Sequence, residues 1–131
     1  MNATSLATDQ KLRALGACPV FSGISADVLR VLAEMMQTEV FAAGESLFEV
    51  GEASDRVFVV AEGTLSVYPP AQAQAVRTLG AGELLGEYGM FAALSRTAAV
   101  RAAADSVLLS LDYARFRAFL LQYPSATLVL L

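Results

Sequence analysis

The sequence contains no histidine, and this absence excludes more functions than any other feature of its composition. Without histidine the chain cannot form the Ser-His-Asp or Cys-His arrangements of many hydrolases. It also cannot form the histidine-ligated metal sites of many small barrel enzymes, so we expect no metal site. A hydrolase built on two carboxylates stays possible. However, 131 residues with 8% aromatics leave little room for a sugar cleft, so the composition argues against an enzyme.

Basic residues, cysteine and long apolar runs are also scarce. The single lysine is Lys11 and the net charge is −4, which disfavours a nucleic-acid surface because phosphate neutralisation needs clustered Lys and Arg. The single cysteine, Cys18, cannot form an internal disulfide, and we expect a packed thiol. We expect neither a signal peptide nor a membrane span, since a span needs about 20 apolar residues. Together these features predict a cytoplasmic protein.

Hydrophobic residues are abundant, at 56% of the chain against 17% charged residues, and predict one globular domain with a real core. Helical spacing of apolar residues, with Ser25 and Asp112 as N-caps, predicts helices at 10–16, 26–37 and 113–122. Short β-branched and aromatic runs bounded by glycine predict strands at 38–41, 46–48, 56–61, 64–68, 75–79, 98–102 and 106–111. The pattern predicts a mainly β sandwich or barrel with flanking helices.

Two turns in this pattern are expected to join neighbouring strands. Glu62 and Gly63 fit a tight hairpin turn between the strands at 56–61 and 64–68. Residues 69–74 are expected to form the tip of a second hairpin.

The segment 82–100 interrupts the strand pattern and carries the candidate chemistry. A short helical piece at 87–92 follows Gly86, and the unpaired N–H groups of a helix N-terminus suit an anion. Gly86 and Gly89 have no Cβ, so a ligand can approach the backbone there. Arg96 offers a planar fork of donors for phosphate oxygens, whereas Glu87 has the wrong sign for phosphate and suits a sugar hydroxyl. Taken singly, each charge also fits an ordinary surface position.

The absence of other phosphate-site motifs narrows the ligand further. No glycine loop with Lys-Ser/Thr is present, and no obvious carboxylate pair awaits magnesium. An anion clamp beside a sugar-reading carboxylate therefore indicates a nucleotide with a single phosphate, held without a metal.

The run Gly86-Glu87, then Arg96-Thr97-Ala98-x-Val100, resembles the phosphate-binding cassette of the cyclic nucleotide-binding domain family. The similarity extends over residues 18–122 and includes glycines at matching intervals, at positions 44, 51 and 63. This resemblance implies a jelly-roll β-barrel (a double-stranded β-helix) with N- and C-terminal helices.

The same resemblance implies a role for each residue of the cassette. Glu87 would accept a hydrogen bond from the ribose 2′-hydroxyl, and Arg96 would pair with the cyclic phosphate. The backbone N–H groups of Gly89 and Thr97 would also face the phosphate. The Thr97 hydroxyl leaves cGMP open beside cAMP, because a threonine here can touch a guanine base in family members.

Other positions are implied to shape the pocket. Gly86 and Tyr88 would form the turn, and the base would lie against strand residues such as Val59 and Leu65. Ser95 stands where the family often has proline, which is expected to loosen the loop without abolishing binding.

The resemblance divides the chain into an N-terminal tail and short helix at 1–16, a nucleotide-binding domain at 17–123, and the start of a truncated C-terminal lid helix at 124–131. We expect a regulatory sensor of cAMP, with cGMP second, that needs no cofactor. It would signal through its C-terminal helices to an effector in a longer parent protein. The alternative is a ligand-free member of the same fold that serves as an interaction or oligomerisation domain, motivated by Ser95 and the apolar C-terminus. An enzyme on a jelly-roll scaffold is the third hypothesis.

Overall fold

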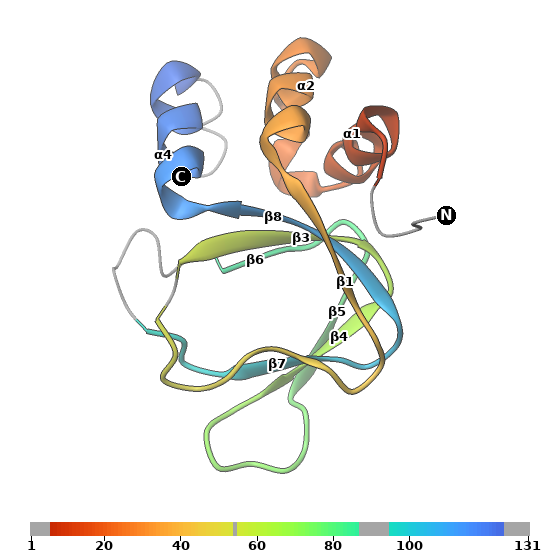
Figure 1. Ribbon diagram of the computed structural model, residues 1–131, viewed down its shortest axis with the longest axis vertical. Helices are drawn as coiled ribbons and strands as arrows, with labels where there is room; N and C mark the ends of the chain where they lie inside the picture. The colour runs from red at the N-terminus through yellow and green to blue at the C-terminus, as the bar shows by residue number, and fades with distance from the viewer. Residues whose placement is uncertain (1–5, 54, 87–94, 125–131) are drawn as a thin grey trace.

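The computed structural model describes residues 6–53, 55–86 and 95–124. Two β-sheets pack face to face, and the helices lie together on one side of them, above β3 and β8 (Figure 1). The elements in chain order are α1 (Thr8–Gly16), the 3-10 turn η1 (Pro19–Phe21), α2 (Ala26–Met35), β1 (Gln37–Phe41), β2 (Ser46–Phe48), β3 (Arg56–Glu62), β4 (Thr64–Tyr68), β5 (Arg77–Gly80), β6 (Leu84–Leu85), β7 (Ala99–Ala102), β8 (Ser106–Asp112) and α4 (Tyr113–Gln122).

The strands form two four-stranded sheets in the orders β1-β8-β3-β6 and β2-β7-β4-β5. Neighbouring strands within each sheet are antiparallel. The chain passes from one sheet to the other at every connection between consecutive strands except the one from β4 to β5. Repeated crossing of this kind is typical of a jelly roll, so the expected fold class is confirmed.

Gly63 is the place where the expected hairpin is wrong. β3 pairs with β6 and β8, whereas β4 pairs with β5 and β7, so the chain turns a corner between the two sheets at Gly63. Its φ is +101°, and a Cβ there would lie 2.7 Å from the Asp105 carbonyl oxygen. Glycine is therefore required by the close approach of a distant strand as well as by the turn. The hairpin expected at 69–74 is confirmed by the pairing of β4 with β5.

Helices α2 and α4 begin where the sequence places their caps, whereas α1 begins at Thr8, two residues before the expected start, and α2 ends at Met35, two residues before the expected end. The Ser25 hydroxyl accepts from Val28 N at 3.4 Å, and an Asp112 carboxylate oxygen accepts from Arg115 N at 2.8 Å. Helix α1 is tied to the next helix because Lys11 Nζ donates to the carbonyl of Met36, the C-cap of α2, at 2.6 Å. The short N-terminal helix is thus packed with the elements that follow it.

Two apolar clusters form the core, one between helices and sheet and one inside the barrel. Because side chains alternate along a strand, β3 serves both: Val57 and Val59 face the helices, and Phe58 and Val60 face the barrel interior. Cys18 is buried in the helix-side cluster, as expected for a packed thiol. The remaining fully or largely buried members of that cluster include Leu15, Phe21, Leu29, Leu32, Phe116 and Phe119.

Candidate functional site

Arg96 lies just before β7, and its backbone is fixed by the loop that follows β2. Arg96 N donates to the Glu52 carbonyl at 2.8 Å, and Gly51 N donates to the Arg96 carbonyl at 2.8 Å. The neighbouring Ser95 forms an isolated antiparallel bridge with Ala53. These contacts hold Ser95 and Arg96 against the loop that follows β2. The direction of the Arg96 side chain is therefore set by the fold.

The Arg96 side chain turns inward and is only 6% exposed. Its Nη2 donates to the Arg56 carbonyl at 2.9 Å, and its Nη1 lies 3.5 Å from the Tyr113 hydroxyl. The guanidinium carbon lies 4.1 Å from the centre of the Phe48 ring. An oxygen of Asp55 is 3.9 Å from Nη2, but this carboxylate is 75% exposed. Three separate elements, β2, β3 and α4, therefore surround one cation.

The electrostatic balance of Arg96 is incomplete. Burial of a charge is costly unless it is paired and hydrogen-bonded. Here the ion pair with Asp55 is long and largely exposed to solvent, and Nε is buried with no hydrogen-bond partner among the described residues. A planar fork with an unused buried donor suits an anion with several acceptor oxygens, and phosphate is such an anion.

Gly86 packs directly against this arginine. Its φ is +93°, and a Cβ at this position would lie 2.8 Å from the Arg56 carbonyl oxygen and 3.0 Å from Arg96 Nη1. The expected role of Gly86 in allowing close approach thus has a geometric basis. The group that approaches the glycine, however, is the chain's own guanidinium.

Tyr113 is the residue that the sequence pattern missed. The pattern placed it only at the start of the helix expected at 113–122, with no role in the site. Its hydroxyl instead donates to the Gly86 carbonyl oxygen, and the hydroxyl oxygen itself lies 3.5 Å from Arg96 Nη1. No sequence signal singles out this tyrosine, because its partners are 27 and 17 residues away.

The other residues predicted in segment 82–100 include some that the structure describes and some that lie outside the described residues. Ser95 and Thr97 flank Arg96 in the chain, and both are exposed. Glu87, Tyr88 and Gly89 lie outside the described residues, as does the helical piece expected at 87–92 and the lid expected after Pro124.

Val59 and Leu65, the two residues expected beside the base, do not lie together. Both are fully buried. Val59 belongs to the helix-side cluster, and Leu65 belongs to the cluster inside the barrel. On β3, the residues that share the barrel-interior cluster with Leu65 are Phe58 and Val60 rather than Val59.

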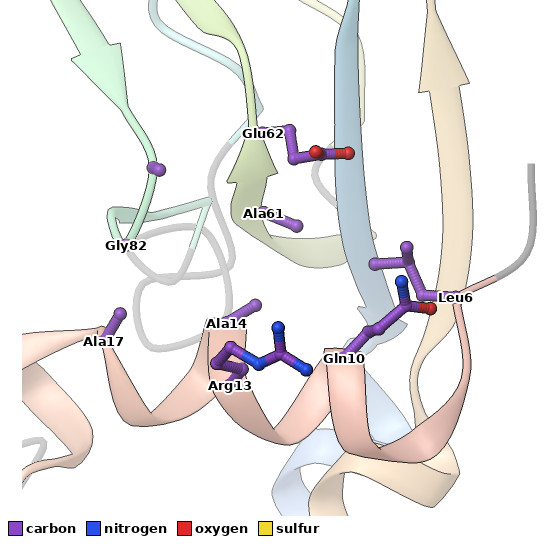
Figure 2. Close-up of a pocket in the computed structure, with 9 residues that line it drawn as sticks. Leu6, Gln10, Arg13, Ala14, Ala17, Ala61, Glu62 and Gly82 are labelled. Carbon is purple, nitrogen blue, oxygen red and sulfur yellow. The ribbon is translucent and has the colours of Figure 1, made fainter.

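A separate cavity of about 310 Å³ lies between α1 and the ends of β3 and β5 (Figure 2). Small residues form most of its wall, and the charged groups at its rim are Arg13 and Glu62. None of the predicted site residues lines it. Across the described ranges, no group of three acidic or cysteine side chains is placed to hold a metal ion. In the same part of the chain, no helix has the length and apolar character needed to cross a bilayer.

Comparison with known proteins gives a family match that covers most of the chain. The model of the cyclic nucleotide-binding domain matches residues 38–123. A cyclic nucleotide-gated potassium channel of Mesorhizobium japonicum is 33% identical over 103 residues, which cover 79% of this chain and 28% of the channel. This chain therefore spans less than a third of that relative's length.

Solved structures agree with the fold. The N-terminal domain of a transcriptional regulator from Streptomyces coelicolor is 27% identical and superposes with a TM-score of 0.80 over 89% of this chain and 86% of that one. The regulatory domain of Toxoplasma gondii PKA, crystallised with cAMP, has a TM-score of 0.78 at 22% identity and covers 86% of this chain and 45% of its own.

Proposed function

Because the chain belongs to the cyclic nucleotide-binding domain family, we propose that it senses a cyclic nucleotide whose phosphate is held by Arg96. One observation carries the proposal: Arg96 is a buried cation whose Nε has no partner among the described residues. A cyclic phosphate has exocyclic oxygens that can accept from such a fork in two places at once. Binding would supply the counter-charge that the exposed Asp55 provides only weakly.

The remaining roles follow the family pattern. Glu87 accepts a hydrogen bond from the ribose hydroxyl, and the backbone of Gly89 and Thr97 adds donors to the phosphate. We propose cAMP as the ligand and cGMP as the second choice. Support for cAMP comes from the Toxoplasma domain that was crystallised with it. The Thr97 hydroxyl is the reason for testing cGMP as well.

The module's output passes, in this proposal, to an effector outside the chain through the C-terminal helices. Curated relatives are much longer than the matched region, as the 28% coverage of the potassium channel illustrates. We propose that the domain works in the cytoplasm, contacts no nucleic acid itself, needs no cofactor and catalyses no reaction. Helix α4 is the element nearest to the site that can carry the signal, because it begins at Tyr113.

Substitution of the arginine tests the phosphate site. Arg96→Ala should weaken cAMP binding by about 2–5 kcal/mol, or about 30-fold to several thousandfold, as expected when one partner of a charge-assisted pair is lost. Equilibrium dialysis with labelled cAMP gives the affinities, and circular dichroism shows whether the variant is folded. A folded Arg96→Ala chain with parental affinity would place the phosphate elsewhere.

Arg101→Ala is the matched control, since it removes the same charge from the neighbouring strand β7. Arg101 lies 3.6 Å from Glu49 in an exposed pair, and such pairs contribute about 0–1 kcal/mol to stability. A hydrogen bond with Ser46, followed by the charge of Arg101, holds the pKa of Glu49 below its usual range. We expect this variant to bind cAMP as the parent does.

Self-association of the parent chain without any nucleotide binding would instead favour the alternative function, that of an interaction or oligomerisation domain.

A further inference from the structure

Tyr113 occupies the junction between the candidate site and the last described helix. It is the first residue of α4, and its backbone N–H donates to the Asp55 carbonyl at 2.9 Å. Its half-buried side chain extends to the site, where the hydroxyl donates to the Gly86 carbonyl and lies 3.5 Å from Arg96 Nη1. One side chain thus contacts the residue before segment 87–94 and the arginine that follows it.

Helix α4 makes apolar contacts with the core and polar contacts through the Tyr113 hydroxyl, and only the polar contacts depend on the charge and position of neighbouring groups. Phe116, Phe119 and Leu120 bury its inner face in the helix-side core. Apolar packing is non-directional and has no dependence on the charge of a ligand. A phenol oxygen, by contrast, donates one hydrogen bond and accepts others, and the strength of each depends steeply on distance and angle.

Arg96 is the group through which a ligand would reach this oxygen. At 3.5 Å the contact between Nη1 and the phenol is at the outer limit of a hydrogen bond. A phosphate that accepts from the unpartnered Nε and from one Nη group would draw the guanidinium toward itself and away from the phenol and the Arg56 carbonyl. Movement of the guanidinium toward the phosphate by a fraction of an ångström is enough to lose the weaker contact.

We propose that Tyr113 is a positioning residue that makes α4 respond to phosphate at Arg96. The inference rests on the proposed function, and it adds the atom that links the site to the helix. In the structure the phenol bridges Gly86 and Arg96. Phosphate binding releases the Arg96 side of that bridge, and the change is passed to the first turn of α4, because Tyr113 is part of it. A ligand shifts an equilibrium only through its differential affinity for two states, and the bridged and released states differ in the donors that Arg96 can offer.

Tyr113→Phe tests this, because it deletes one oxygen and keeps the ring that packs against the core. Tyr123→Phe is the matched control: Tyr123 is the C-cap of α4, and its ring packs on Phe119 at 5.2 Å. Hydrogen exchange of residues 113–122 is measured on the full chain, with and without cAMP at concentrations that saturate each variant. Calorimetry gives the dissociation constants in parallel.

In the parent and in Tyr123→Phe, cAMP should change the exchange rates of α4. In Tyr113→Phe, cAMP should bind within about tenfold of the parent affinity, as expected for loss of one hydrogen bond, and the change in α4 exchange should fall by at least half. An undiminished change in α4 exchange rates in Tyr113→Phe would overturn the inference. So would a parent chain whose α4 exchange rates are the same with and without bound cAMP. Failure of the parent to bind any cyclic nucleotide would instead overturn the proposed function itself.

Discussion

Gly86→Ala tests the close packing beneath the phosphate arginine. The left-handed backbone of Gly86, at φ +93°, costs an L-residue about 1–2 kcal/mol. The added methyl would also lie 2.8 Å from the Arg56 carbonyl oxygen and 3.0 Å from Arg96 Nη1. The carbonyl belongs to β3 and cannot move freely, so overpacking should add about 1–3 kcal/mol. We therefore expect the free energy of unfolding to fall by about 2–5 kcal/mol in total.

Gly44→Ala separates the two contributions. Gly44 has nearly the same φ, +91°, but a Cβ there meets nothing within 4 Å. This variant should lose only the backbone part, about 1–2 kcal/mol. Urea denaturation followed by circular dichroism measures both variants, with comparison valid while the m-values agree. Binding of cAMP should weaken in Gly86→Ala and stay parental in Gly44→Ala. Equal destabilisation of the two variants would refute the close approach between Gly86 and Arg96.

Two further predictions concern the helices that cover the barrel. Leu15→Ala should lower the free energy of unfolding by about 2–5 kcal/mol, because Leu15 is fully buried in the helix-side core, whereas Leu121→Ala at a 77% exposed position should change it by less than about 0.5 kcal/mol. Chemical denaturation of these two variants tests whether α1 is part of the folded domain. Equally small effects of both substitutions would show that α1 does not contribute to the stability of the domain. Asp112→Ala should cost about 0.5–2 kcal/mol, since it removes the cap that accepts from Arg115 N. Asp112→Asn, which can still cap, should recover most of that loss in a thermal melt, and no difference between the two variants would exclude the capping role.

Local elements were predictable wherever a residue and its signal lie close in the sequence. The strand Thr64–Tyr68 and the helix Tyr113–Gln122 have the predicted bounds, because β-branched alternation and the Asp112 cap are local features. The two-residue strand Leu84–Leu85 was not predicted, since it is too short for any periodicity to appear.

Strand pairing was harder to predict from the sequence than the bounds of the strands. A glycine with positive φ serves a hairpin turn and a corner between sheets equally well, so Gly63 could not distinguish them. What decides is the close approach of Asp105 and Ser106, more than 40 residues along the chain. Partner choice of this kind depends on the whole sheet rather than on the turn itself.

The candidate site shows the same division. Arg96 and Gly86 could be proposed from residue type and spacing, and the structure places them in contact. The inward packing of the guanidinium on Phe48 and the Tyr113 bridge could not be proposed, because each depends on residues from separate elements. Helical spacing placed Tyr113 in the helix at 113–122, and it gave no information about the hydroxyl.

Calorimetric titration of the 131-residue chain with cAMP, and then with cGMP, tests the central claim most directly. The account predicts saturable binding at one site per chain. It also predicts that the free energy of unfolding rises by about 2.7 kcal/mol when free nucleotide reaches about 100 times the dissociation constant. Absence of both heat and thermal shift at millimolar concentrations of either nucleotide would contradict it.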